Sequence, residues 1–90
     1  MTMTERTVML IVDDVEINRA ILSQFFQNEY EILEASNGEE ALEILESRNV
    51  DIMLLDLMMP VMDGMEVLGV LHKNPRFSHI PLLSLLRRMW

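Results

Sequence analysis

Short apolar runs alternate along the chain with segments in which apolar residues recur every three or four positions. Each run has the length of a strand, and each of the other segments has the spacing of one helix face. The runs are TVMLIV at 7–12, YEILEA at 30–35, VDIMLL at 50–55 and IPLLSLL at 80–86. This pattern predicts the order βαβαβαβ with short connections, which is typical of a parallel α/β sheet with right-handed crossovers.

The composition of each segment predicts its position in the fold. The run at 7–12 is nearly continuous in apolar residues, as expected of a strand covered on both faces, whereas the run at 30–35 is more polar and is expected near an edge. The first helix is expected to be amphipathic because apolar residues recur through it at helical spacing. These residues are Ile17, Ala20, Ile21, Phe25 and Phe26.

Polar residues mark where the helices should begin and end. Asp14 is placed to cap the first helix, and the residues from Ser36 to Glu39 have the S-x-x-E form of a capping box for the second. The third helix is expected to begin with the D-x-x-E pattern at Asp63, and Asn74 with Pro75 should close it.

Length, charge and cysteine content limit the classes of protein that fit. Ninety residues make at most one domain. The 7 basic and 15 acidic side chains give a net charge of −8, which argues against a nucleic-acid or anionic-membrane surface, since both need clustered Lys and Arg. There is no cysteine for disulfides or zinc, no signal-peptide core and no run long enough to span a membrane. We therefore expect a small cytoplasmic protein.

Three aspartates follow two of the predicted strands. Asp13 and Asp14 end the first run, and Asp56 ends the third. Ligands of parallel α/β sheets bind outside the carboxyl ends of the strands, so the three carboxylates would meet if these strands are neighbours. Two like charges about 5 Å apart repel by roughly 3 kcal/mol at an effective dielectric near 20, so the group should take up protons or hold a cation. An oxygen-only, partly open site suits Mg²⁺, and Asp56 could then act as a nucleophile toward a phosphoryl donor.

Each of these aspartates also has a simpler interpretation. A lone aspartate after a strand is more often a cap or a turn residue, and Asp14 could simply cap the first helix. The spacing of all three in a βα order favours the metal site.

The same residues resemble the receiver domain of two-component response regulators, the CheY-like family. The resemblance is carried by LIVDDVEINR, EASNGEEAL, DIMLLDLMMPVMDGMEVL and HIPLLSL, in this order along the chain. It covers about residues 7–86 of a single domain over 1–90, with an atypical tail at 87–90. It implies a flavodoxin-like, three-layer α/β/α fold with parallel strand order 2-1-3-4.

The resemblance also implies a role for each matched residue. Asp56 would be the phospho-acceptor. Its phosphoryl group would come from a sensor histidine kinase or from a small acyl phosphate. Asp14 and Asp56 would bind Mg²⁺ (or Mn²⁺) through their side chains, Met58 through its backbone carbonyl and Asp13 largely through water. Such a module carries a signal, so we do not expect a turnover enzyme.

Two residues that receivers need are not matched. Leu86 stands where a Ser or Thr is expected at the end of the fourth strand, and the Lys that ends a fifth strand has no counterpart before Trp90. The resemblance therefore implies an incomplete receiver that lacks the fifth strand and the last two helices. An uncovered sheet face or a bare edge of the fourth strand would then favour a homo-oligomer.

The sequence leaves two functions open. The first is a phospho-accepting signalling domain whose phosphorylation or readout is impaired, because the residues that sense the phosphoryl group are missing. The second is a phosphate-independent module that self-associates or titrates a kinase. Incubation with acetyl phosphate and Mg²⁺ distinguishes them.

Overall fold

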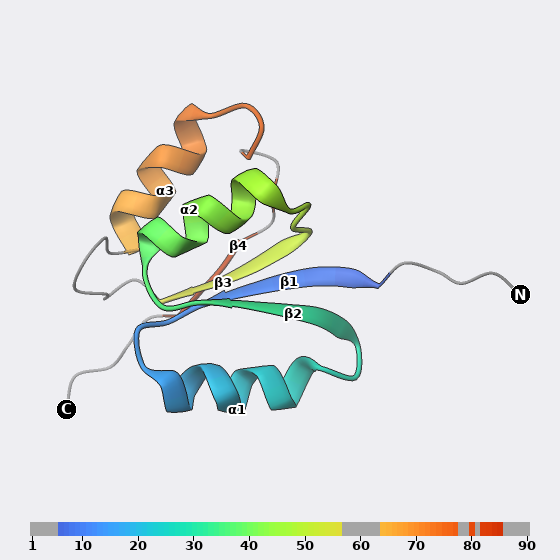
Figure 1. Ribbon diagram of the computed structural model, residues 1–90. Helices are drawn as coiled ribbons and strands as arrows, with labels where there is room; N and C mark the ends of the chain where they lie inside the picture. Colours follow the sequence, from blue (N-terminus) through green and yellow to red (C-terminus); the bar gives the residue numbers. More distant parts are fainter. Residues whose placement is uncertain (1–5, 57–63, 78–79, 81, 86–90) are drawn as a thin grey trace, which may run out of the picture.

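The computed structural model describes residues 6–56, 64–77, 80 and 82–85, without the side chains of residues 64–65, 67–68 and 82–85. No helix in these ranges is long and apolar enough to cross a bilayer. The elements follow the predicted order (Figure 1). They are β1 (Thr7–Val12), α1 (Glu16–Phe26), β2 (Tyr30–Ala35), α2 (Gly38–Ser47), β3 (Ile52–Asp56), α3 (Gly64–Lys73) and β4 (Leu82–Leu85).

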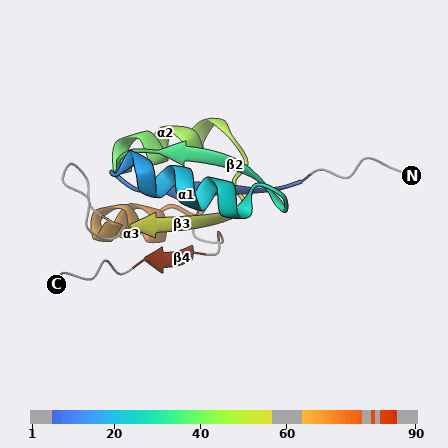
Figure 2. The same cartoon turned by 90° about the horizontal axis from the view of Figure 1, so that it is seen from below.

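The strands form one parallel sheet in the order β2-β1-β3-β4, as predicted (Figure 2). The more polar β2 lies at an edge, which confirms the interpretation of its sequence. Val12 at the end of β1 pairs with both Ala35 and Leu55, so the ends of β2, β1 and β3 are level. Asp56 pairs with Leu85 and belongs to β3 itself, where the sequence pattern ended the strand one residue earlier.

Helices cover both faces of the sheet, with α2 and α3 on one side and α1 on the other (Figure 1). Alternate residues of each strand point to opposite faces, which produces two apolar clusters. The cluster under α2 and α3 consists of Leu10, Val12, Ala35, Ala41, Leu45, Val50, Met53, Leu55, Leu71 and Phe77. The cluster under α1 consists of Met9, Ile11 and Leu54, with Leu22, Phe26, Tyr30, Ile32 and Ile52 packed around it.

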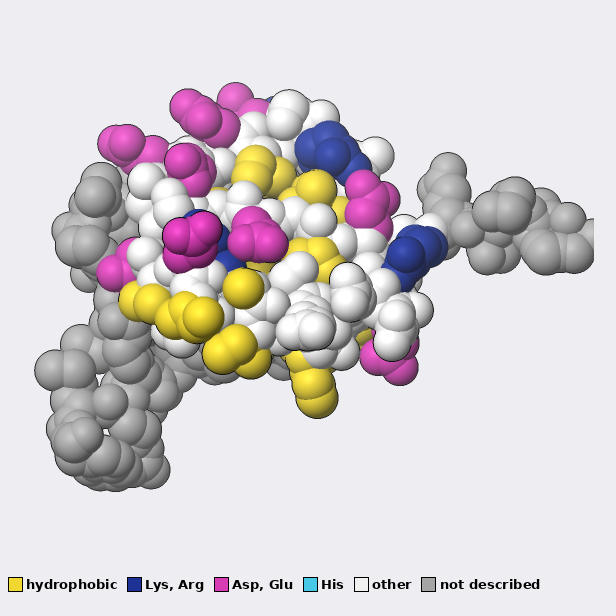
Figure 3. Space-filling model, turned by 60° about the horizontal axis from the view of Figure 1, so that its bottom comes forward, with side chains coloured by type: hydrophobic (Ala, Val, Ile, Leu, Met, Phe, Trp, Pro, Cys, Tyr) yellow, Lys and Arg dark blue, Asp and Glu magenta, His cyan; other side chains and the backbone are white. Residues whose placement is uncertain are grey.

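Helix α1 buries a different face from the one that its apolar spacing indicates. Ile17, Ile21 and Phe25, which we call the exposed stripe, are 64%, 59% and 75% exposed and lie on the α1 side of the molecule (Figure 3). The side chains of α1 that pack on the sheet are Leu22 and Phe26. The outer face of α1 therefore exposes apolar surface, and the expected uncovered sheet face stays a prediction because the side chains of β4 lie outside the described residues.

The predicted caps of α1 and α2 are shifted, whereas Asp63, the predicted start of α3, lies outside the described residues. Asp14 does not cap α1, because Val15 occupies the N-cap position without a side-chain hydrogen bond. The N-cap of α2 is Asn37, whose side chain accepts a hydrogen bond from the N–H of Glu40 at 2.9 Å. The N-cap of α2 therefore lies one residue later than Ser36, the first residue of the S-x-x-E pattern. Helix α3 ends at Lys73, directly before Asn74 and Pro75, as predicted.

Candidate functional site

Three carboxylates converge at the carboxyl ends of β1 and β3. Asp13 and Asp14 follow β1 directly, and Asp56 is the last residue of β3. One carboxylate oxygen from each residue lies within 4.8 Å of the other two. Asp13 and Asp56 are 4% and 1% exposed, and Asp14 is half-buried. The structure thus brings together the three aspartates as the sequence predicted, since β1 and β3 are hydrogen-bonded neighbours.

This arrangement is electrostatically costly unless something compensates it. At an effective dielectric near 20, two unit charges at this separation repel by about 3 kcal/mol, and burial of two of the groups increases the cost of keeping them charged. Carboxylate oxygens in this number, with one group partly open to solvent, fit the ligand preference of Mg²⁺, which keeps several waters. The donor set therefore fits a small divalent cation.

The loop that carries Asp13 and Asp14 is fixed by three hydrogen bonds. The Asp13 N–H donates to the carbonyl of Ala35 at 3.1 Å, and the Asp13 Oδ1 accepts from the N–H of Val15 at 2.9 Å. The guanidinium of Arg19 donates to the backbone carbonyl of Asp13 at 2.8 Å. The bond to Val15 explains why Asp14 is not the cap: the turn is closed by Asp13, and Asp14 is left to join the acidic cluster.

The sequence interpretation missed Arg19. Its Nε also pairs with the Oε1 of Glu34 on β2, at 3.2 Å. One signal was available, because Arg19 is the only basic residue from Thr7 to Gln27 and follows the acidic pair by one and a half helical turns.

The start of α2 lies at the same edge of the sheet. The Oε1 of Glu40 accepts from the N–H of Ser36 at 2.7 Å and from the Ser36 hydroxyl at 2.8 Å. These two donors, of which the backbone N–H is the larger influence, lower the pKa of Glu40 from its ordinary 4.5, and the charge of Arg19 adds to the effect. The carboxylate of Glu40 is thus stabilised in its charged form.

The other residues named from the sequence have different outcomes. Met58 and Leu86 lie outside the described residues, so the backbone ligand and the missing hydroxyl stay predictions. Ser84 is the hydroxyl-bearing residue of β4, two positions before Leu86, and its backbone pairs with Leu55, one position before the level of Asp56.

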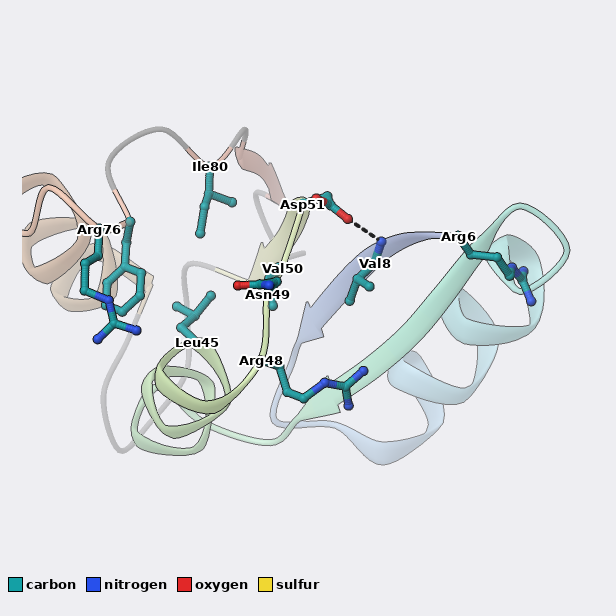
Figure 4. A pocket seen from close by; sticks show the side chains of 10 residues that line it. Arg6, Val8, Leu45, Arg48, Asn49, Val50, Asp51, Arg76 and Ile80 are labelled. Carbon is teal, nitrogen blue, oxygen red and sulfur yellow. Dashed lines mark hydrogen bonds between the residues drawn. The ribbon is translucent and has the colours of Figure 1, made fainter. Parts of the chain in front are cut away.

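A hollow of about 440 Å³ lies at the amino ends of β1 and β3, opposite the three aspartates (Figure 4). We call it the basic groove, because three arginines and one aspartate line it together with apolar side chains. Its lining consists of Arg6, Val8, Leu45, Arg48, Asn49, Val50, Asp51, Arg76, Phe77 and Ile80.

Comparisons with known proteins agree with this geometry. The family model described as response regulator receiver domain matches residues 9–87. A probable cyclic di-GMP phosphodiesterase of Vibrio cholerae is 45% identical over 76 residues, which is 84% of this chain but only 17% of that protein. This chain therefore spans less than a fifth of that relative's length.

This chain covers a larger share of two similar proteins of known structure than it does of the phosphodiesterase. The chemotaxis protein CheY4 of Vibrio cholerae has a TM-score of 0.87 at 29% identity, covering 96% of this chain and 72% of that one. The response regulator TrrA of Thermotoga maritima, solved in complex with Mg²⁺–BeF, has a TM-score of 0.73 at 42% identity, covering 78% of this chain and 62% of that one.

Proposed function

The chain belongs to the response regulator receiver domain family, and on that premise we propose that it is the phospho-accepting module of a two-component phosphorelay, with Asp56 as the acceptor. The observation that carries the proposal is the convergence of Asp13, Asp14 and Asp56 within 4.8 Å at one edge of the sheet. Receiver domains act in signalling. The phosphodiesterase activity named for the Vibrio cholerae protein belongs to that protein, of which this chain covers 17%.

In the proposed reaction, a carboxylate oxygen of Asp56 attacks the phosphorus of a phosphohistidine on a sensor kinase. The new O–P bond makes an acyl phosphate, the P–N bond breaks, and the released imidazole takes up a proton. Asp56 is 1% exposed, and this burial would limit the access of water to the acyl carbon. Mg²⁺ or Mn²⁺, when bound, would neutralise charge on the phosphoryl oxygens.

The proposed ligands of the cation are the side chains of Asp14 and Asp56, the backbone carbonyl of Met58 and, through water, Asp13. The rigid parallel sheet supports this assignment, since the ends of β1 and β3 are in register and hold the carboxylates before a cation arrives. The complex of TrrA with Mg²⁺–BeF supports it as well, because that relative is 42% identical over the part compared.

Phosphorylation by a small donor tests the proposal directly. The protein is incubated with acetyl phosphate and Mg²⁺, and the intact mass is measured. We expect a gain of one phosphoryl group in the wild type and in Asp51→Asn, whose carboxylate lies at the far end of the sheet, and none in Asp56→Asn. A gain that persists in Asp56→Asn, or no gain in the wild type, contradicts the assignment.

The second function, a phosphate-independent interaction module, is the alternative outcome of the same experiment. Self-association, the cognate sensor kinase and a cytoplasmic location stay proposals. The exposed stripe of α1 and the edge position of β4 support self-association. Light scattering that shows a folded monomer at micromolar concentration would contradict self-association.

A further inference from the structure

Arg19 connects three segments next to the acidic cluster. It lies in the first turn of α1, and its side chain is 16% exposed. Its Nη1 donates to the backbone carbonyl of Asp13 at 2.8 Å, and its Nε pairs with Glu34 of β2 at 3.2 Å. One guanidinium therefore ties the loop after β1 to both α1 and the end of β2.

The contact to Asp13 matters because the side chain of that residue belongs to the cluster. The carbonyl, the N–H and the Oδ1 of Asp13 each have a hydrogen bond, to Arg19, Ala35 and Val15 respectively. The planar fork of a guanidinium can hold two acceptors at fixed angles, which a lysine ammonium does not reproduce. Loss of Arg19 would remove the bond to the Asp13 carbonyl and the link from the loop to β2.

The charge of Arg19 acts in the opposite direction. A cation beside a cation site repels the incoming ion, and this effect would weaken binding of Mg²⁺. Glu34 offsets the effect, however, because its carboxylate accepts from the same guanidinium and keeps the local sum of charge near zero. We therefore expect the positional effect to outweigh the repulsion.

We infer that Arg19 is a positioning residue of the proposed phosphorylation site, holding the Asp13–Asp14 loop in the geometry that binds the divalent cation. The inference rests on the proposed function, in that the site must bind such an ion. Groups that orient metal ligands through hydrogen bonds typically contribute about 10–100-fold to metal affinity. Arg19 acts through the loop backbone, so we expect a value at the lower end of this range.

The chain contains a matched control for this inference. Arg48 also pairs with a glutamate of β2, Glu31, at 2.7 Å, but it does so at the end of the sheet remote from the cluster. Removing either arginine therefore breaks one ion pair to the same strand. Only removal of Arg19 also breaks a hydrogen bond to a residue of the cluster.

The experiment is calorimetric titration of Mg²⁺ into the full chain, with thermal unfolding without metal measured in parallel. We expect Arg19→Gln to raise the Kd for Mg²⁺ about tenfold, Arg19→Lys to raise it by less, and Arg48→Gln to leave it unchanged. If Arg19→Gln does not fold, Arg19→Lys against Arg48→Gln carries the same comparison.

The possible failures are distinguishable. A wild type that does not bind Mg²⁺ contradicts the proposed function. A wild type that binds, with equal or tighter binding by the Arg19 variants, overturns the inference alone, because it shows that repulsion dominates or that the loop needs no support. Equal losses of affinity in Arg19→Gln and Arg48→Gln also overturn it, since they indicate a general effect on stability.

Discussion

The two ends of the sheet differ in how their charged side chains are arranged. At the carboxyl ends of the strands, three aspartates lie within 4.8 Å of one another. At the amino ends, the three arginines of the basic groove are each engaged by the protein itself. Arg6 donates to the carbonyl of Tyr30 at 2.8 Å, Arg48 pairs with Glu31, and Arg76 lies over the ring of Phe77 at 5.1 Å from its centroid.

Two aspartates illustrate the difference, because each accepts a hydrogen bond from a backbone N–H. The Oδ1 of Asp13 accepts from Val15 N–H at 2.9 Å, and the Oδ2 of Asp51 accepts from Val8 N–H at 2.8 Å. Asp51 is exposed and joins the start of β3 to β1, whereas Asp13 is buried beside two further carboxylates. Like charges kept together against their own repulsion indicate a functional demand, whereas a single bonded carboxylate is explained by structure alone.

The largest expected effect is a gain of stability when the acidic cluster loses a charge. Asp56→Asn removes one partner from two repulsive pairs, so the metal-free protein should gain about 1–3 kcal/mol in unfolding free energy. Excess Mg²⁺ should stabilise the wild type by mass action and leave the variant nearly unchanged. Urea unfolding of both proteins in EDTA and in Mg²⁺ measures this. A variant less stable than the wild type in EDTA would show that the cluster is not under repulsion.

Much of this end of the molecule could be predicted from the sequence. Alternating runs fixed the order of the elements, and the convergence of Asp13 and Asp56 then depended on one assumption, that β1 and β3 are neighbours. The observed pairing of Val12 with Leu55 confirms it. Because Val12 and Leu55 are in register, the residues that follow them, Asp13 and Asp56, are placed side by side by the backbone pairing alone.

Features that depend on side-chain geometry were not predictable in the same way. Ile17, Ile21 and Phe25 have the spacing of a core face, but spacing cannot tell which of two adjacent apolar faces meets the sheet, and α1 packs through Leu22 and Phe26. The caps differ from the prediction because Asp13 accepts the bond from the Val15 N–H before α1, and Asn37 accepts the bond from Glu40 at the start of α2. Arg19 was missed because its partners include a backbone carbonyl, which no residue pattern reveals.

A smaller effect compares the two bonded aspartates directly. Asp13→Asn and Asp51→Asn each keep an oxygen that can accept the backbone N–H and remove one charge. We expect Asp13→Asn to raise the Kd for Mg²⁺ at least about tenfold, equivalent to about 1.4 kcal/mol, and Asp51→Asn to leave it unchanged. Titration of Mg²⁺ monitored by calorimetry measures both. Equal effects of the two substitutions would mean that total charge, rather than the cluster, determines affinity.

The smallest effect concerns the pH dependence of stability at the start of α2. The donors on Ser36 lower the pKa of Glu40 from 4.5, so the folded state binds this proton more weakly than the unfolded state does. The contribution of Glu40 is therefore fully present above pH 4.5 and is lost as the pH falls through the lower, folded-state pKa.

Glu40→Gln should remove that contribution at every pH, because the amide can accept from Ser36 but has no proton to take up. Since Glu40 is exposed, the difference in unfolding free energy between the wild type and Glu40→Gln should be small. Urea unfolding between pH 6 and pH 3 should show the wild type losing stability more steeply than the variant below about pH 4.5. Parallel curves would mean that the bonds from Ser36 do not distinguish the charged from the neutral carboxyl of Glu40.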